Sequence, residues 1–205
     1  MNTSEQQGLV WDLPVRIGHW LLVACFATAW LTGESEERRL IHVYAGGLML
    51  GVVSFRLLWG FIGSPHALFG DFVRGPRTVI DYLQSLFSKQ PRHFIGHNPA
   101  GGWAVMALLT LVLLGSVSGW LNYQELGGEW AEELHEATAN MLLAVVAAHL
   151  CGVLVSCAVH RENLVHSMLT GMKRAPAENA IINARPVAAL MLLVWAVTLA
   201  WLLGR

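Results

Sequence analysis

The sequence predicts an all-α integral membrane protein, a four-helix bundle with a fifth transmembrane helix. Of the 205 residues, 55% are hydrophobic and only 13% are charged. The mean hydropathy is +0.49, far above that of soluble domains. Five apolar stretches reach the length of about 20 residues that spans a bilayer. The formal net charge of -1 and the lack of a basic stripe argue against a nucleic-acid partner.

Ordinary boundary signals mark the predicted helices. Pro14 precedes the first helix, Gly33 closes it, and Pro186 lies in the first turn of the fifth. The N-terminus lacks the basic region of a signal peptide, so we expect the first helix to be retained. We expect residues 1–174 to form the four-helix domain, and residues 175–205 a linker with the last helix. The predicted helices are 16–33, 41–62, 101–121, 136–158 and 185–203.

The connection from residue 63 to residue 100 is more polar than the helices. Within it, residues 78–87 place several apolar side chains on one face. This pattern is typical of a short helix on the membrane surface, and a plain connector is an equal alternative. Elsewhere, three cysteines in apolar stretches lack a Cys-x-x-Cys spacing, which favours core residues over disulfides or metal ligands. These are Cys25, Cys151 and Cys157.

The basic residues of the loops predict the orientation, because Lys and Arg collect on the cytoplasmic side. The third-to-fourth loop has no basic residue, whereas the second-to-third and fourth-to-fifth loops have several. These are Arg74, Arg77, Lys89 and Arg92 in the former and Arg161, Lys173, Arg174 and Arg185 in the latter. Arg38 and Arg39 in the first loop run against this pattern. The majority places the N-terminus in the cytoplasm and the C-terminus outside.

Four histidines lie in or at the ends of the apolar stretches, where an ionisable side chain is costly and usually functional. In this orientation His19 lies near the inner side, and His42 and His135 near the outer side. His149 follows His135 by fourteen residues, about 21 Å and close to four turns of helix, so the two share one face. Depth alone then pairs His42 with His135 and His19 with His149.

Two such pairs on opposing helices indicate two haems with axial histidine ligands. Zinc is the rival metal, but a structural zinc site draws four ligands from one neighbourhood. These four histidines are divided between levels about 20 Å apart. The remaining histidines lie in loops or at helix ends, where a solvated or capping role is expected. They are His66, His93, His97, His160 and His166.

Arg56 follows His42 by fourteen residues, which places it on the same helix face at the level of the inner pair. A guanidinium at that depth needs a partner such as a haem propionate or a quinone headgroup. The alternative is an arginine that extends to the cytoplasmic headgroups. Arg16, at the inner end of the first helix, is a similar candidate, although a topology anchor is the commoner role. Small residues on the second and third helices allow close approach of a helix or a flat ring. These are Gly46, Gly47, Gly51, Gly115 and Gly119.

An ordered series of motifs resembles the bacterial cytochrome b561 family, which is related to the cytochrome b subunits of nickel-iron hydrogenases. The motifs are Trp11-Asp12-Leu13-Pro14, Arg16-Ile17-Gly18-His19-Trp20, His42-Val43-Tyr44-Ala45-Gly46, Phe55-Arg56-Leu57-Leu58-Trp59-Gly60, Gly96-His97-Asn98-Pro99, Leu134-His135-Glu136, Ala148-His149-Leu150 and Arg161-Glu162-Asn163-Leu164. The resemblance covers residues 8 to about 174. It implies a bacterial inner-membrane protein that binds two b haems through the four histidines and exchanges electrons with quinone. The shortest members lack the fifth helix, so its role here is either a partner interface or a lid on the core.

Three functions are compatible with these features. The first is electron transfer between quinone and an external redox protein, such as a lysine-rich c-type cytochrome attracted by the acidic third-to-fourth loop. The acidic residues are Glu125, Glu129, Glu132, Glu133 and Glu136. The second is a superoxide:ubiquinone oxidoreductase, which would need a positive funnel where only Arg38 and Arg39 are available. The third is a non-redox scaffold or transporter, which the paired histidine depths and the family motifs disfavour.

Quinone and membrane lipid are the expected small-molecule partners. The Gly-His-Asn-Pro loop enters the third helix at the level of the inner histidine pair. We therefore expect a quinone site on the cytoplasmic side near Arg56, His97 and Asn98.

Overall fold

A computed structural model describes residues 6–88 and 90–205 and confirms the membrane helical bundle. Five helices are long and apolar enough to cross a membrane. They are α1 (Leu13–Thr32), α2 (Arg39–Ile62), α5 (Pro99–Tyr123), α6 (Gly128–His160) and α8 (Pro186–Leu203). Lys89, one of the predicted basic loop residues, and residues 1–5 lie outside the described part of the chain.

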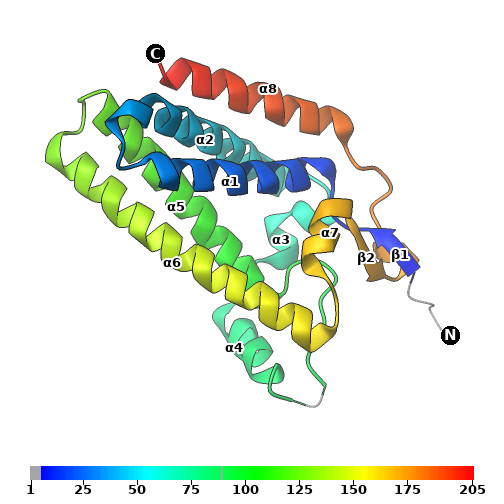
Figure 1. The fold of residues 1–205 in the computed structure, drawn as a ribbon. Helices are drawn as coiled ribbons and strands as arrows, with labels where there is room; N and C mark the ends of the chain where they lie inside the picture. Colours follow the sequence, from blue (N-terminus) through cyan, green and yellow to red (C-terminus); the bar gives the residue numbers. More distant parts are fainter. Residues whose placement is uncertain (1–5, 89) are drawn as a thin grey trace.

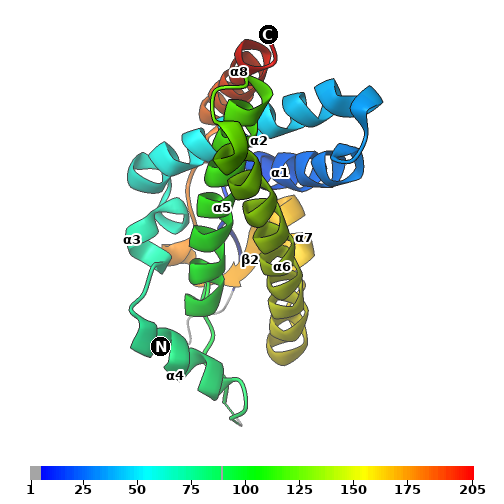
Figure 2. The ribbon, with the colours of Figure 1, turned by 90° about the vertical axis from the view of Figure 1, so that its left-hand side faces the viewer.

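The helices pack in chain order, with α1 on α2, α2 on α5 and α5 on α6. Helix α8 lies against α2 and α1, on the side of the bundle away from α6 (Figure 1, Figure 2). The fifth helix therefore covers the second helix and extends the four-helix core on one side only.

The observed and predicted boundaries differ most at α6, which begins at Gly128 rather than at residue 136. Glutamate forms helices well and is favoured near a helix N-terminus, where it faces the positive end of the helix dipole. Hydropathy marks where the bilayer begins, and this helix starts before that point. The acidic residues expected in a loop, Glu125 excepted, therefore form the first turns of α6, and all of them are exposed.

Short elements gather at one end of the bundle, where the chain also begins (Figure 1). They are α3 (Phe69–Phe72), α4 (Pro76–Ser85), α7 (Leu164–Thr170) and the 3-10 helices Pro65–Ala67 and Ala177–Asn179. The opposite end holds the α1–α2 connection with its 3-10 helix Glu36–Arg38, the α5–α6 connection and the C-terminus. The two ends thus differ in structure as well as in charge.

A small antiparallel sheet, absent from the prediction, pairs β1 (Gln6–Leu9) with β2 (Met172–Ala175). Gln6 lies opposite Ala175, and Leu9 lies opposite Met172. Strands this short and this distant in the chain have no local signature, because their pairing depends on the helices that bring them together. The sheet joins the start of the chain to the segment that follows α7.

Helix α4 confirms the short amphipathic helix in place of a plain connector. Its Tyr82 is 2% exposed and lies edge-on to Phe94, with 5.6 Å between the ring centroids. Phe87, predicted on the same apolar face, lies beyond the end of the helix and is 93% exposed.

The cysteines are all free, but only one has the buried position expected for a core residue. Cys25 is buried, Cys157 is half-buried and Cys151 is exposed on α6. The prediction was wrong for Cys151 because a membrane helix is apolar on its lipid-facing side as well as on its core side.

Two glycines of α2 allow the fifth helix, α8, to pack closely against α2. A Cβ atom on Gly47 would lie 2.8 Å from the Cα of Ala200, and one on Gly51 would lie 2.5 Å from the Cα of Ala196. Both distances are shorter than two carbon atoms allow, so the backbones of α2 and α8 approach through small residues. Gly46 differs, because a Cβ there would meet nothing within 4 Å.

We expect Gly51→Ala to destabilise the bundle by about 1–3 kcal/mol, the usual cost of forcing an extra methyl group into a packed contact. The measurement is the midpoint of thermal unfolding of the purified protein in detergent. Gly70→Ala is the matched control, because its new Cβ would meet nothing within 4 Å. Equal midpoints for the two variants would contradict the close contact between α2 and α8.

Candidate cofactor sites

The outer pair brings His42 of α2 to His135 of α6, with 5.8 Å between the ring centroids and the ring planes at 80°. The Nδ1 atom of His42 lies 2.9 Å from the carbonyl oxygen of Ala29, and that of His135 lies 2.8 Å from the carbonyl oxygen of Gly115. A carbonyl only accepts, so each Nδ1 carries the hydrogen and each Nε2 keeps its lone pair. Backbone carbonyls orient metal-binding histidines in this way.

Two glycines next to the outer histidine pair leave room for the imidazole rings and for a flat ligand. A Cβ on Gly119 of α5 would lie 2.7 Å from the ring of His135, so only glycine lets α5 pass that close to the imidazole. Gly46 follows His42 by one turn on the same face of α2 and has open space where a Cβ would stand. Such a position admits the edge of a flat ring beside the histidine.

The inner pair is formed by His19 of α1 and His149 of α6. His19 lies near enough to His149 for their charges to interact, and its ring packs edge-on to Trp20 at 5.3 Å between centroids. Helix α6 is continuous from Gly128 to His160, so the fourteen-residue step from His135 to His149 stays on one face. The structure thus brings His42 and His135 together and places His19 within electrostatic range of His149, while the ligand pairs stay a prediction.

These side chains fit a haem better than a metal ion held by protein groups alone. Within residues 6–88 and 90–205, no three His, Cys, Asp or Glu side chains come together as a metal site, whereas a haem iron needs only two axial imidazoles. Trp120, next to Gly119, has a buried Nε1 atom with no hydrogen-bond partner. A buried donor of this kind suits a haem propionate.

Arg56 lies at the inner end of α2 with its guanidinium 5.1 Å from the ring centroid of Phe69 and 5.8 Å from that of Phe72. Its Nη1 and Nη2 atoms are buried and have no hydrogen-bond partner. The side chain therefore does not extend to the headgroups, and that alternative was wrong. A buried guanidinium without partners is costly, which favours an anionic or polar ligand at this point.

His97 packs against the same Phe72 ring. Its ring centroid is 4.6 Å from that of Phe72 and 4.7 Å from that of Trp11, and its Nδ1 atom is buried without a partner. Burial, and after it the positive charge of Arg56, lower the pKa of His97 to about 3. The imidazole is therefore neutral at physiological pH and offers one donor and one acceptor.

The prokaryotic cytochrome b561 family model matches residues 10–171, which include all four histidines, Arg56 and His97. This chain belongs to the cytochrome b561 family. It is a membrane electron-transfer cytochrome, and its family implies haem b as cofactor.

The curated relatives carry related names. A "Probable Ni/Fe-hydrogenase B-type cytochrome subunit" of Rhizobium leguminosarum bv. viciae is 25% identical over 82% of this chain and 89% of the relative. One of the same name in Rhodobacter capsulatus is 23% identical over 79% of each chain. The "Probable Ni/Fe-hydrogenase 1 B-type cytochrome subunit" of Escherichia coli K12 is 30% identical over 57% of this chain and 60% of the relative. No solved structure matches significantly.

Two further residues that the sequence predicts at the cofactor sites make contacts that hold the fold together. The Oδ1 atom of Asn98 accepts a hydrogen bond from the backbone N–H of Gly101 at 2.7 Å and so caps α5. The Nη2 atom of Arg16 donates to the carbonyl oxygen of Leu169, which attaches α7 to α1. The Nε atom of Arg16 is buried without a partner. Asn98 thus caps α5 next to His97, and Arg16 joins α1 to α7.

Sequence reasoning missed the buried carboxylate of Asp12. Its Oδ1 caps α1 by accepting from the N–H of Val15 at 2.9 Å, and its Oδ2 accepts from Trp59 at 2.9 Å and Ser64 at 2.6 Å. Asp12 also interacts electrostatically with Arg56. The available signal was an Asp two residues before a proline at the start of an apolar helix, which is an N-cap pattern.

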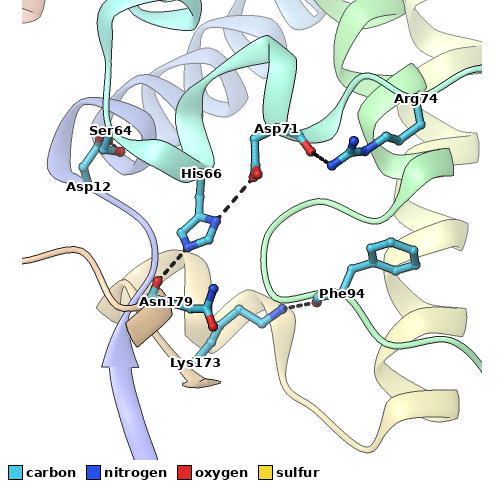
Figure 3. A network of polar contacts seen from close by, with 8 residues as sticks. All are labelled: Asp12, Ser64, His66, Asp71, Arg74, Phe94, Lys173 and Asn179. Atoms are coloured by element: carbon cyan, nitrogen blue, oxygen red, sulfur yellow. Dashed lines mark hydrogen bonds and ion pairs between the residues drawn. The ribbon is translucent and has the colours of Figure 1, made fainter. Parts of the chain in front are cut away.

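His66 was expected to be solvated, but its side chain is buried, with only 7% of the residue exposed. Its Nε2 lies 2.8 Å from the carbonyl oxygen of Asn179, and its Nδ1 lies 3.4 Å from Asp71 (Figure 3). Asp71 also bonds Arg74 through its backbone carbonyl. The prediction failed because the loop after α2 folds back against a segment more than a hundred residues later, which no local pattern records.

The end of the cytochrome that holds the α1–α2 and α5–α6 connections has a hollow of about 520 Å³. Arg39 lies there over the ring of Tyr123, with 5.4 Å from the guanidinium carbon to the centroid. Glu36, Glu37 and Glu125 line the same hollow. This mixture of charges does not make the positive funnel that an anionic superoxide substrate would need.

Proposed function

We propose that this cytochrome carries electrons across the membrane between a quinone and an external redox protein. His42 with His135 would hold an outer b haem, and His19 with His149 an inner one. The observation that carries this proposal is the outer pair, whose Nδ1 atoms are committed to backbone carbonyls and whose Nε2 atoms remain available. The haems supply one-electron chemistry, while the protein fixes their ligands and surroundings.

The proposed membrane is the bacterial inner membrane, with the N-terminus in the cytoplasm and the C-terminus in the periplasm. Support comes from the end that carries α3, α4 and α7, where the exposed basic residues collect. They are Arg74, Arg77, Arg92, Arg161 and Arg174. The opposite end carries the exposed glutamates of α6. Residues 1–174 would form the electron-transfer domain, with the rest as linker and fifth helix.

Arg56 and His97 are the proposed quinone ligands. A cation and a neutral imidazole that both lie near the Phe72 ring offer hydrogen bonds to the carbonyl oxygens of a quinone ring. The site lies on the cytoplasmic side in the proposed orientation. The alternative partner for Arg56 is a haem propionate, which is an anion.

The external partner is proposed to be a hydrogenase, as the names of the curated relatives suggest. The exposed glutamates of the α5–α6 region favour a second candidate, a lysine-rich c-type cytochrome, through charge complementarity. Both candidates would deliver or accept electrons at the outer haem.

The test is a haem assay followed by partner exchange. Purified protein should show a b-type reduced-minus-oxidised spectrum with two haems per chain and should be reduced by quinol. A triple change of Glu129, Glu132 and Glu133 to lysine should slow exchange with a c-type cytochrome about tenfold or more while leaving quinol-driven reduction unchanged. If exchange with cytochrome c is unaffected and hydrogen reduces the haems in native membranes, the partner is a hydrogenase. A protein without haem would refute the proposal.

A further inference from the structure

Glu162 lies at a sharp turn between two helices on the side of the proposed quinone site. Arg161 ends α6 with a left-handed backbone, φ 51°, and Asn163 starts α7 by accepting a hydrogen bond from the N–H of His166 at 2.9 Å. The turn directs Glu162 inward, and its side chain is only 14% exposed. A carboxylate held this way by two helix ends has a fixed position.

Two basic side chains share one oxygen of that carboxylate. The Oε2 atom of Glu162 is 3.2 Å from Nζ of Lys173 and 3.4 Å from Nε2 of His93, while Oε1 is buried without a partner. Lys173 is 3% exposed and also donates to the carbonyl oxygen of Phe94 at 3.4 Å (Figure 3). A structural ion pair would normally satisfy both carboxylate oxygens, so the free Oε1 needs another explanation.

The charges of this group keep Glu162 ionised, in the form that can accept a proton. Burial alone would raise the pKa of Glu162, but His93 and Lys173 outweigh it and hold that pKa below its ordinary value. Burial lowers the pKa of Lys173, against the effect of Glu162. The other titratable groups facing the pair are His160, whose ring lies 5.3 Å from that of His93, and Cys157. The resting state is therefore a carboxylate beside an ammonium.

Glu162, His93 and Lys173 lie near both a pocket and the loop that carries His97. Outward, Glu162, His93 and Lys173 line a pocket of about 680 Å³ that also receives His160, His166 and Arg174. Inward, the charge of Lys173 acts on His97, which follows Phe94 on the same loop and keeps a buried Nδ1 without a partner. The group thus borders the pocket and is joined, through the contact of Lys173 with Phe94, to the loop that carries His97.

We propose that Glu162, with Lys173 and His93, carries protons between this pocket and the quinone held at Arg56 and His97. The proposal rests on the proposed quinone site. Reduction of a quinone to a quinol consumes two electrons, which a haem held by His19 and His149 would supply, and two protons. Glu162 receives each proton at Oε2 from protonated His93, which pocket water reprotonates, or from pocket water itself. Rotation of the carboxyl group then turns the protonated oxygen inward, and release of the proton regenerates the carboxylate. Quinol oxidation runs the same path outward.

The test follows quinol-driven haem reduction in the holoprotein. Glu162→Gln should slow it about tenfold or more, the lower part of the range for a lost proton-transfer group. Glu162→Asp should restore much of the rate, as should added formate, a small acid that the pocket can admit. Haem reduction by dithionite and the haem potentials should stay unchanged. Glu178→Gln, an exposed glutamate outside the pocket, is the matched control.

The outcomes separate this inference from the function on which it rests. If the unmodified protein is not reduced by quinol, the quinone site itself is refuted. If quinol reduces it and Glu162→Gln is equally fast, or is slowed without any rescue by formate or aspartate, the proton path is refuted. Should Glu162→Gln fail to fold because Lys173 loses its partner, the double variant with Lys173→Met removes both charges and is measured in the same way.

Discussion

His135→Ala is expected to remove the outer haem and leave the inner one, so that the haem content falls from two per chain to one. The reason is that the ring of His135 lies 5.8 Å from that of His42, and bis-histidine ligation cannot survive without either ring. His149→Ala should remove the inner haem instead. The measurement is the haem-to-protein ratio together with a redox titration, in which each variant should lose a different one of the two components.

His166→Ala is the control for this pair of variants, because His166 is an exposed histidine of α7. It should retain both haems. If His135→Ala and His149→Ala also retain both, the ligand assignment is wrong. If each variant loses both haems, the two sites fold together, and the assignment is then decided by whether added imidazole restores one component.

The transmembrane helices and the two histidine levels could be predicted because both depend on simple periodicity. Apolar length locates the spans, and fourteen residues on a continuous helix keep His135 and His149 on one face. The facing rings of His42 and His135 follow from depth, without knowledge of the loops. The Nδ1 bonds to backbone carbonyls could not be predicted, because Ala29 and Gly115 belong to other helices.

The rest of the candidate site depends on contacts between distant segments. Glu162 and Lys173 stand eleven residues apart in the sequence, but their pairing requires α7 and β2 to fold back, and β2 is held by the start of the chain. His97 and Arg56 likewise come together only because both pack near Phe72, which follows α2 in the chain. Local pattern placed these residues at one common end of the bundle and left their partners undetermined.

Arg56→Leu is expected to slow quinol-driven haem reduction about ten- to a hundredfold, the kinetic equivalent of one charge-assisted hydrogen bond. The fold should tolerate the change. The guanidinium lies beside the rings of Phe69 and Phe72 with its Nη atoms unpartnered, and replacing a buried charge of this kind by an apolar side chain is commonly neutral or stabilising. Stopped-flow absorbance with a soluble quinol measures the rate.

Two further variants serve as a comparison and a control for Arg56→Leu. Arg56→Lys keeps the charge but loses the planar fork, so its rate should lie between those of the unmodified protein and Arg56→Leu. Arg77→Leu removes an exposed arginine of α4 and should have no effect. If Arg56→Leu instead shifts the potential of the inner haem while the quinol rate at saturation is unchanged, the partner of Arg56 is a haem propionate. In that case His97 alone would have to hold the quinone. If neither the quinol rate nor the potential of the inner haem changes in Arg56→Leu, Arg56 binds neither the quinone nor a haem propionate.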